Sequence, residues 1–384
     1  MKLNKHPCWP RQNLGRVNNM PRQSATILIM AAGTGGHIFP ALAIAKVLRE
    51  ESANVHWLGT PNGMENELLE ATGIPLHQIS VSGLRGSGIQ RKLMAPIMLL
   101  SAFYQSVGVL RLVKPDCVLG MGGFVCGPAG LAAKLLRKPL LIHEQNAVAG
   151  LTNKLLSKLA NRTLEAFPGT FEKAKSVLLT GNPVRKEILS FDHSGAGTSA
   201  EKKTFNILVL GGSQGAHAIN TVVPELLAAL DDRNVHVLHQ AGKGKVEQTS
   251  QAYELAGLTL EGQYNVQAFV SDMAKAYAWA DLVISRSGAS TVCEIAAAGR
   301  ASVLVPYPYH WDKQQTRNAD WLADKGAAII VQQAELTGSV LCELVKDLIE
   351  NRNKLLQMSK EASKLAIRDA ADVIANECLR FANA

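Results

Sequence analysis

Cysteines are few in this sequence and they do not cluster. The six lie at Cys8, Cys117, Cys126, Cys293, Cys342 and Cys378. None forms a CxxC pair or sits with histidine at metal-ligand spacing, so neither a disulfide framework nor a structural zinc site is expected. We predict free thiols, mostly buried as small core residues, and no metal.

Long apolar runs are lacking as well. The least polar stretch, residues 93–110, is shorter than the roughly 20 residues that a bilayer-spanning helix needs, and it contains a proline and a glycine. The first 24 residues are basic and have no continuous apolar core. The sequence therefore predicts neither a transmembrane helix nor a signal peptide, and residues 1–24 are expected to form a flexible extension.

Charge is moderate and does not select a partner. The formal net charge is +8, with 47% hydrophobic and 19% charged residues, which is typical of a globular protein. A surplus of this size is compatible with anionic lipid, phosphorylated substrates or nucleic acid. A chain of 384 residues is long enough for two domains with separate cores.

Two stretches of the sequence resemble each other. Residues 27–37 (ILIMAAGTGGH) align without gaps on residues 207–217 (ILVLGGSQGAH), and a helix-like pattern follows each, over residues 40–50 and 218–230. An apolar run, a glycine-rich turn and a helix form the opening unit of a doubly wound domain. Further strands are expected at Val55–Leu58, Cys117–Leu119, Leu140–Ile142, His236–His239, Leu282–Ser285 and Ser302–Val305.

We therefore predict the α/β class, with two tandem Rossmann-like, doubly wound domains that face a cleft. The expected domains are residues 25–187 and 188–384, and the polar stretch 191–203, or a point slightly before it, marks the boundary. The last helix could pack back on the first domain. A ligand would sit between the domains, beyond the carboxyl ends of the strands.

Three glycine-rich loops suit phosphate binding. They are residues 33–36, 120–123 and 211–215. Glycines let main-chain N–H groups approach an anion, and a following helix N-terminus favours negative charge. Each loop could also be no more than a tight turn. The region after the second strand, Val55–Thr60, has no acid for a dinucleotide ribose, and no loop has the P-loop pattern, so NAD and P-loop chemistry are disfavoured.

The most specific block is residues 284–299, a strand, a Ser/Gly turn and a helix that carries Glu294. A carboxylate there is suited to two vicinal ribose hydroxyls, and the turn amides can meet phosphate. Adjacent Gln314 and Gln315 offer amide groups for sugar hydroxyls. The alternative is that Glu294 and the glutamines are ordinary solvated residues.

Eight motifs then follow in one order along the chain. They are GTGGHIFPALAIA (from Gly33), GMGGFVCGP (from Gly120), HEQNAVAGLTNK (from His143), AFPGTF (from Ala166), TGNPVR (from Thr180), GGSQGA (from Gly211), RSGASTVCEIAAAG (from Arg286) and HWDKQQ (from His310). This series resembles the motifs of the MurG family of glycosyltransferases, from about Ile27 to the C-terminus.

The resemblance implies a GT-B fold and an inverting transfer of N-acetylglucosamine. The donor would be UDP-GlcNAc, and the acceptor the C4 hydroxyl of the N-acetylmuramyl group of undecaprenyl-diphosphate-linked MurNAc-pentapeptide (lipid I). The product would be lipid II, for peptidoglycan synthesis. No cofactor and no nucleic-acid partner are implied, and other cell-wall enzymes are possible partners.

The resemblance also assigns residues. Glu294 would bind the ribose, Val270 the uracil and the glutamines the sugar, with the remainder near the pyrophosphate or the transferred sugar. The donor-binding set is Thr34, Gly35, Gly36, Asn146, Arg185, Ser213, Val270, Ala289, Ser290, Thr291, Val292, Cys293, Glu294, Gln314 and Gln315. The acceptor diphosphate would meet Gly120, Gly122 and Gly123.

The transfer needs a base for the acceptor hydroxyl. We predict His37, on the first glycine loop, because imidazole titrates near neutral pH. His37 could instead only hydrogen-bond the loop or a diphosphate. Glu144 is a rival carboxylate that could instead orient a neighbouring group. His217 holds the equivalent place in the repeat, and we assign it no catalytic role.

Residues 89–114 carry apolar side chains at near-helical spacing, at Ile97, Leu100, Tyr104 and Val107. Basic residues surround them, at Arg85, Arg91, Lys92, Arg111 and Lys114. A MurG-like protein would dock this patch on anionic lipid, as a peripheral protein at the cytoplasmic face of the bacterial inner membrane. An ordinary amphipathic helix packed on the sheet would account for most of the apolar positions.

Some positions depart from the family pattern. Thr316 and Arg317 stand where an aromatic pair is usual, beside the glutamines assigned to the sugar. A transferase for another UDP-sugar or lipid acceptor is therefore one alternative, and a non-catalytic nucleotide-sugar sensor is another. A glycosidase is disfavoured because the glycine loops show only isolated acids.

Overall fold

The computed structural model describes residues 24–81, 89–172, 176–190, 203–212, 215–260, 262–310 and 312–384, with the backbone alone for residues 89–93. The predicted extension, except Ser24, and nearly all of the predicted boundary stretch lie outside these ranges.

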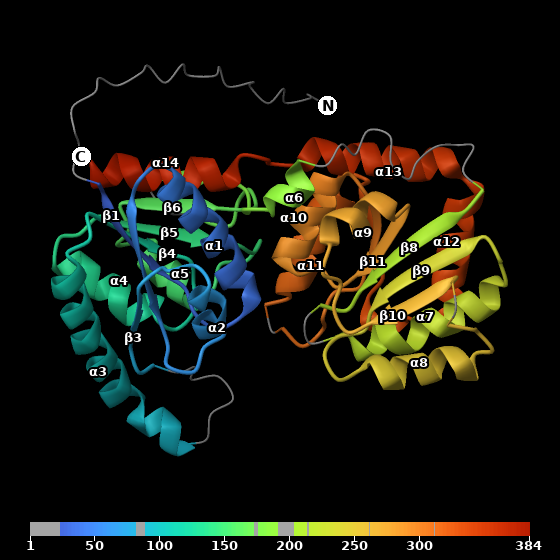
Figure 1. Cartoon of the computed structure of the whole chain (residues 1–384), viewed down its shortest axis with the longest axis horizontal. Coiled ribbons are helices and arrows are strands. Elements are labelled where there is room, and N and C mark those ends of the chain that lie inside the picture. Colours follow the sequence, from blue (N-terminus) through green and yellow to red (C-terminus); the bar gives the residue numbers. More distant parts are fainter. Residues whose placement is uncertain are drawn as a thin grey trace.

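The first sheet has seven parallel strands in the order β3-β2-β1-β4-β5-β6-β7. Figure 1 shows it in blue to green. Its strands are β1 Thr26–Met30, β2 Asn54–Gly59, β3 Leu76–Gln78, β4 Cys117–Gly120, β5 Leu140–Glu144, β6 Arg162–Glu165 and β7 Val177–Leu179. The helices of this part are α1 Gly35–Glu50, α2 Glu65–Glu70, α3 Ile89–Val113, α4 Cys126–Leu135 and α5 Leu151–Leu156.

The second sheet has six parallel strands in the order β10-β9-β8-β11-β12-β13. Its strands are β8 Phe205–Leu210, β9 Val235–Gln240, β10 Tyr264–Gln267, β11 Leu282–Ser285, β12 Ala301–Leu304 and β13 Ala328–Ile330. Around them lie α6 Lys186–Leu189, α7 His217–Leu230, α8 Val246–Leu255, α9 Met273–Trp279, α10 Ala289–Ala298, α11 Gln314–Ala323, η1 Gln333–Glu335, α12 Gly338–Glu350 and α13 Arg352–Leu365.

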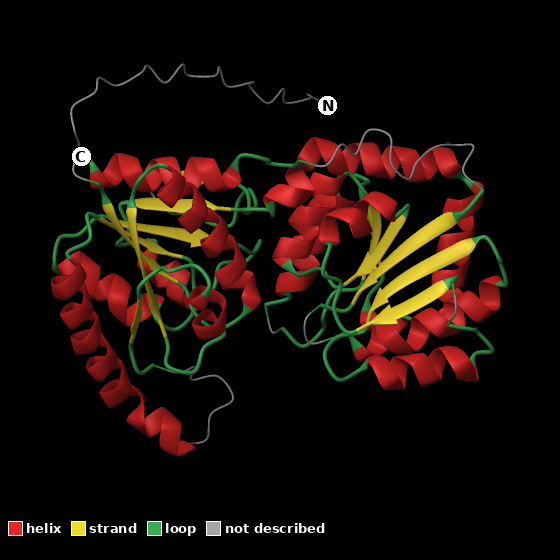
Figure 2. Cartoon of the chain, in the orientation of Figure 1, coloured by secondary structure: helices red, strands yellow, loops and turns green. Residues whose placement is uncertain are grey.

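The strand order β3-β2-β1-β4 of the first sheet is repeated as β10-β9-β8-β11 in the second, as the repeat in the sequence predicts. Helices cover each sheet (Figure 2), and β1, β4, β8 and β11 are almost entirely buried apolar runs. The order reverses direction between β1 and β4, and again between β8 and β11, and such switch points are where doubly wound sheets bind ligands. The predicted fold class is confirmed.

Helix α3 corrects one expectation. Residues Met94–Val113 form a helical stretch that is long and apolar enough to cross a membrane by length and composition, because the helix continues past Leu110 and includes only one charged side chain, Arg111. However, α3 connects β3 to β4 of one sheet, and Ala102, Ser106 and Leu110 are buried. It is therefore also a crossover helix with one face packed on the first sheet.

The last helix, α14 (Ala370–Ala382), returns to the first sheet (Figure 1). Ile374, Ala375 and Cys378 are fully buried in the same apolar cluster as β1 and α1. The chain therefore crosses between the two parts twice, before β8 and again after α13. The two crossings touch, because Arg368 donates hydrogen bonds to Leu189 O at 3.3 Å and to Ala297 O at 3.0 Å.

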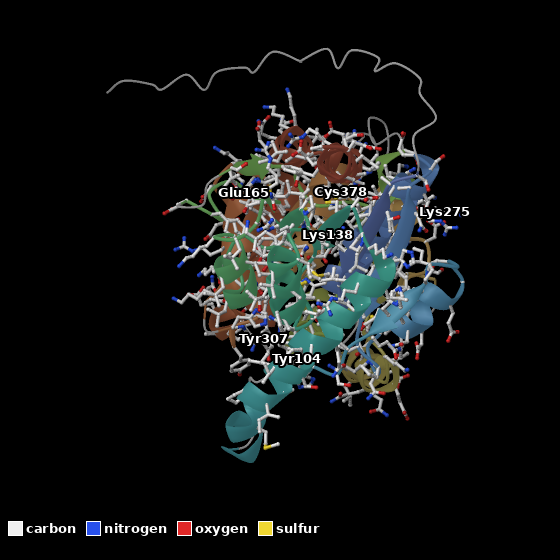
Figure 3. All side chains as sticks on the ribbon, turned by 90° about the vertical axis from the view of Figure 1, so that its left-hand side faces the viewer. Tyr104, Lys138, Glu165, Lys275, Tyr307 and Cys378 are labelled. Carbon is white, nitrogen blue, oxygen red and sulfur yellow. The ribbon has the colours of Figure 1, made fainter. Side chains whose placement is uncertain are left out.

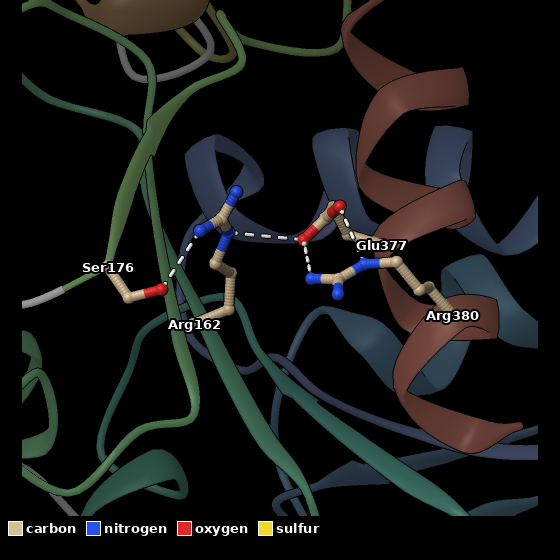
Figure 4. A network of polar contacts seen from close by, with 4 residues as sticks. All are labelled: Arg162, Ser176, Glu377 and Arg380. Carbon is tan, nitrogen blue, oxygen red and sulfur yellow. Dashed lines mark hydrogen bonds and ion pairs between the residues drawn. The ribbon is translucent and has the colours of Figure 1, made fainter. Parts of the chain in front are cut away.

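A polar network fixes α14 on the sheet (Figure 4). Arg162 of β6 lies 3.1 Å from Glu377 of α14 and donates a hydrogen bond to Ser176 at 2.9 Å. Arg380, one turn further along α14, donates to both oxygens of Glu377. The Arg162–Glu377 pair is only partly exposed, so salt screens it less than a fully solvated surface pair.

Candidate active site

The first glycine loop leads directly into α1. Thr34 is the N-cap, and its carbonyl oxygen accepts a hydrogen bond from the main-chain N–H of His37 at 3.0 Å. Gly35, Gly36 and His37 thus lie in the first helical turn, whereas the sequence pattern predicts His37 on the loop itself. The difference matters because the main-chain amides of Gly35 and Gly36, at the start of the helix, have no partner within it and can bind an anion.

The loop after β4 packs against this turn through its glycines. Gly122 has a φ of +105°, and a Cβ at this position would lie 2.8 Å from Cε1 of the His37 ring. A Cβ at Gly123 would lie 2.4 Å from the carbonyl oxygen of Ala32. Only glycine permits this approach, so the two loops and His37 form one compact group, with Gly120 at the end of β4 behind it.

His37 is partly exposed, and its ring is held from one side. Its Nδ1 lies 2.9 Å from Oε1 of the buried Gln145, which follows β5. Within the described residues, its Nε2 has no hydrogen-bond partner. The ring can therefore accept a proton at Nε2 from a bound molecule.

Glu144 is buried and fully engaged. Its Oε1 accepts hydrogen bonds from the main chain and side chain of Asn146, at 3.1 and 3.2 Å. Its Oε2 accepts from Gly150 N at 3.1 Å and from Asn153 Nδ2 at 2.9 Å. Because Glu144 accepts four hydrogen bonds, its carboxylate holds Asn146 and the loop after β5 in place. This favours an orienting role over that of a base.

Asn318 of α11 joins the two parts of the molecule at this loop. Its Oδ1 accepts from Ala147 N at 2.8 Å, and its Nδ2 donates to Asn146 Oδ1 at 3.2 Å and to Ser287 O at 3.1 Å. Asn318 is completely buried. One amide therefore connects the loop after β5, in the first sheet, with the turn after β11, in the second.

Glu294 of α10 is a second buried carboxylate. Its Oε1 lies 3.2 Å from Nε of Arg185, and its Oε2 accepts a hydrogen bond from the Tyr277 hydroxyl at 3.2 Å. Burial raises the pKa of Glu294, while the Arg185 cation and the Tyr277 hydrogen bond pull that pKa down. Carboxylates whose pKa is shifted both by burial and by a specific charged partner are frequent at functional sites.

The turn before α10 has buried hydroxyls that need partners. Within the described residues, Ser287 Oγ and Ser290 Oγ are buried and have no hydrogen-bond partner. Gly288 is the N-cap, so Ser290 and Thr291 belong to the first turn of α10, where main-chain amides are free. Orphaned hydroxyls beside free amides suit the oxygens of a phosphate.

Both halves of the chain match family models. Residues 27–165 match the glycosyltransferase family 28 N-terminal domain, and residues 206–374 match the glycosyltransferase family 28 C-terminal domain. Two curated relatives, from Marinobacter nauticus and Haemophilus influenzae, share the name UDP-N-acetylglucosamine--N-acetylmuramyl-(pentapeptide) pyrophosphoryl-undecaprenol N-acetylglucosamine transferase. They are 47% and 46% identical to this chain, over 96% and 93% of it and 100% and 99% of their own lengths.

A solved structure agrees. The crystal structure of Acinetobacter baumannii MurG matches with a TM-score of 0.80 and 45% identity, and covers 93% of this chain and 99% of that one. The chain belongs to the MurG family. The resemblance in the motifs is thereby confirmed, and so is the class of enzyme, a glycosyltransferase.

Several MurG-family positions expected to touch the donor face inward in this chain. Ala289, Val292 and Cys293 are buried in the apolar cluster beneath α10. Burial raises the pKa of the Cys293 thiol to about 12, so it stays protonated. The side chains of these three residues pack in that cluster, whereas the buried carboxylate of Glu294 pairs with the partly exposed Arg185.

The remaining predicted donor residues frame the turn. The main-chain N–H of Val270 donates to Gln240 Oε1 at 3.1 Å, so this N–H already has a partner. Gln314 begins α11, and Gln315 Oε1 accepts from Tyr307 N at 2.9 Å. Ser213 lies outside the described residues.

Sequence reasoning missed three side chains of this site: Gln145, Asn318 and Tyr277. The amide of Gln145 stands inside the HEQN motif, so its position was visible although its contact with His37 was not. Asn318 follows the paired glutamines by one helical turn, which places it on the same face of α11 as Gln314. Tyr277 gave no signal in the sequence that would separate it from a core tyrosine.

Proposed function

We propose that this chain transfers N-acetylglucosamine from UDP-GlcNAc to the N-acetylmuramyl group of a pentapeptide-bearing pyrophosphoryl-undecaprenol, as the names of its relatives state for them. The observation that carries this proposal is near-full-length identity of 45–48% to the curated relatives. The product would be a disaccharide-bearing lipid precursor of peptidoglycan.

The donor would bind against the second sheet. Glu294 would accept hydrogen bonds from both ribose hydroxyls. The amides of the first turn of α10, with Ser290 and Thr291, would hold the diphosphate. Val270 would meet the uracil through its main chain. Gln314 and Gln315 would contact the sugar, and Arg185, 3.2 Å from Glu294, would approach the diphosphate.

The acceptor would bind against the first sheet. The glycines of the loop after β4 would take its diphosphate, and Asn146, held by Glu144 and Asn318, would orient the sugars. His37 Nε2 would remove the proton from the C4 hydroxyl as its oxygen attacks the anomeric carbon. The bond from that carbon to the phosphate oxygen then breaks, and UDP leaves with the electron pair. Attack opposite the leaving group inverts the anomeric centre.

Stabilisation of the leaving UDP would come from fixed groups of this chain. Arg185 supplies a positive charge, and the N-terminus of α10 supplies oriented amides. The domain contact through Asn318 would hold the base and these groups on opposite sides of the same sugar.

Helix α3 would dock the enzyme on the membrane that holds its acceptor. Ile97, Leu100 and Tyr104 are exposed by 62%, 56% and 65%, while Val107 of the predicted patch is partly packed on the core. Figure 3 shows Tyr104 on α3, which runs along the outer side of the first domain. Arg111 and Lys114 are exposed at its end. Arg85 and the side chains of Arg91 and Lys92 lie outside the described residues.

This surface fits peripheral binding to anionic lipid at the cytoplasmic face of the inner membrane. Other cell-wall enzymes are possible partners there. The arrangement also leaves the second part of the molecule free to take UDP-GlcNAc from solution.

The direct test is a transfer assay. Purified protein is mixed with UDP-GlcNAc and a short-chain analogue of the lipid acceptor, and both UDP and the disaccharide product are measured, with UDP-glucose and UDP-galactose as controls. Acceptor-dependent product from UDP-GlcNAc alone is expected. Equal turnover of another UDP-sugar would overturn the donor assignment, and UDP binding without any transfer would favour a sensor. Replacing His37 with Ala should lower turnover by about 10²-fold or more.

A further inference from the structure

A chain of hydrogen bonds leads from His37 into the protein interior. His37 Nδ1 is 2.9 Å from Gln145 Oε1, Gln145 Nε2 is 3.0 Å from His143 Nδ1, and His143 Nε2 is 3.0 Å from Gly181 O. Gln145 and His143 are exposed by only 1% and 0%. Three contacts in series thus connect the candidate base with the main chain where the two domains join.

The carbonyl of Gly181 fixes the direction of the two inner bonds, between His143 and Gly181 and between Gln145 and His143. A carbonyl oxygen can only accept, so His143 Nε2 must carry a proton. Burial lowers the pKa of His143 to about 4, so the ring is neutral near pH 7 and its Nδ1 has a lone pair. Nδ1 must accept from the amide nitrogen of Gln145, and this turns Gln145 Oε1 toward His37.

The bond between Gln145 and His37 fixes which nitrogen of the His37 ring carries the proton. Gln145 Oε1 can only accept, so His37 Nδ1 must donate, and Nε2 of the neutral ring keeps its lone pair. A general base needs this nitrogen unprotonated. We infer that Gln145 and His143 are positioning residues, which hold His37 in the Nδ1-protonated tautomer and leave its Nε2 bare for the acceptor hydroxyl. The inference rests on the proposed function, because it gives His37 the role of base.

The far end of this chain is held in place. Gly181 has a φ of +74°, and a Cβ there would lie 2.7 Å from Cβ of Ile367, on the second crossing between the domains. Asn182 Nδ2 donates to the main-chain oxygen of Gln145 at 3.0 Å. The carbonyl that sets the direction therefore belongs to a tightly packed turn, which also ties down the main chain of Gln145.

The tautomer can be read without any assay of turnover. Protein labelled with ¹⁵N in its histidine rings is studied by long-range ¹H–¹⁵N NMR near pH 8, and the spectrum of His37→Gln identifies the signals of His37. We expect a protonated Nδ1 and an unprotonated Nε2 for His37, and the opposite assignment for His143. A proton on Nε2 of neutral His37 would overturn the inference.

Two variants of Gln145 separate direction from packing. Gln145→Glu keeps an oxygen acceptor opposite His37 Nδ1, and in its protonated form the acid can also donate to His143. Gln145→Met has nearly the same shape but no acceptor. We expect Gln145→Met to lower kcat about 10- to 100-fold, a range typical for groups that orient a functional histidine, with the donor KM unchanged. Gln145→Glu should keep more activity than Gln145→Met and retain the His37 tautomer.

A role in packing alone gives the reverse order, since a buried apolar methionine is tolerated better than a buried acid. Higher activity of Gln145→Met than of Gln145→Glu would therefore refute the inference. The NMR result also separates it from the proposed function. If His37 has the expected tautomer but no sugar is transferred from any donor, the proposed function fails. The assignment of Gln145 and His143 as residues that set the tautomer then still stands.

Discussion

Arg185 reaches from the segment between the two domains to the buried carboxylate of Glu294, with 3.2 Å between Nε and Oε1. Glu294 is the residue proposed to hold the ribose of the donor. A ribose hydroxyl that binds Oε1 would compete with Arg185 and release the guanidinium toward the diphosphate. The two parts of UDP should therefore respond differently to a change at Arg185.

The first prediction concerns Arg185→Met. UDP affinity should fall about tenfold, because one charge-assisted contact to the diphosphate is lost. Uridine affinity should stay the same or rise, because the ribose no longer competes with Arg185. Calorimetric titration with UDP and uridine measures both, and Arg317→Met, an exposed arginine paired with Asp320 at 3.7 Å, is the control. Equal losses for both ligands would contradict this prediction.

The second prediction concerns Asn318, whose amide joins the loop after β5 to the turn after β11. Asn318→Ala should lower kcat, because Asn146 loses one of the bonds that orient it. Asn318→Asp should be worse, since its second oxygen would face Asn146 Oδ1 and Ser287 O, both acceptors. Steady-state kinetics on both variants provide the test. An aspartate variant more active than the alanine variant would mean that these two donated bonds are unimportant.

The third prediction concerns the pH dependence of stability. His239 is fully buried, its ring is 3.1 Å from both the Tyr253 hydroxyl and Asn220 Oδ1, and burial lowers its pKa from 6.5 to about 3. Between these values the unfolded chain binds a proton that the folded chain does not. Stability must therefore fall as pH decreases through this window, by about 2 kcal/mol between pH 7 and 5 for this residue.

Urea unfolding at pH 7 and pH 5 measures the effect. His239→Gln removes the titrating group, so the loss of stability between the two pH values should shrink by about 2 kcal/mol. His236→Gln, at a partly exposed position on the same strand, is the control. An unchanged difference in His239→Gln would show that His239 takes up its proton in the folded protein.

The fourth prediction concerns α3. Replacing Ile97 and Leu100 together with Gln should reduce binding to vesicles with anionic lipid by about tenfold or more, because two exposed apolar side chains no longer enter the interface. Leu255→Gln on α8, exposed by 90%, is the matched control in the second domain. Binding should also weaken with salt. Equal binding to neutral vesicles would refute the electrostatic part, and resistance to carbonate extraction would favour insertion of α3 over peripheral docking.

The strands β1, β2, β4, β5, β8, β9, β11 and β12 could be predicted from the sequence because they are short apolar runs, most of them followed by a loop with glycine. Their positions deviate by only one or two residues from the expected ones, as for β5, which continues to Glu144. The strands β3, β6, β7, β10 and β13 were missed because they are only three or four residues long and lie at or next to the edges of the sheets. The start of α1 was misplaced because Gly35 and Gly36 are weak helix formers. The structure overrides this weak local preference by packing the Gly122 loop against the turn.

Contacts between distant segments were beyond the reach of the sequence. Gln145 meets His37 across 108 positions, and Asn318 meets Ala147 across 171. Polar side chains of this kind have no periodicity that distinguishes a bridging amide from a surface one. The side chains that face ligands could be named from motifs, whereas those that hold them in place needed three-dimensional contacts.

The return of α14 to the first sheet has a consequence for biosynthesis. The core of the first domain includes Ile374, Ala375 and Cys378, which the ribosome adds about 200 residues after β7. At about 5–20 residues per second, this domain must wait roughly 10 to 40 s on the ribosome before its core can close. During that interval the apolar surface that α14 later covers stays open to solvent, and a premature stop codon anywhere in the second half of the gene removes part of both domains.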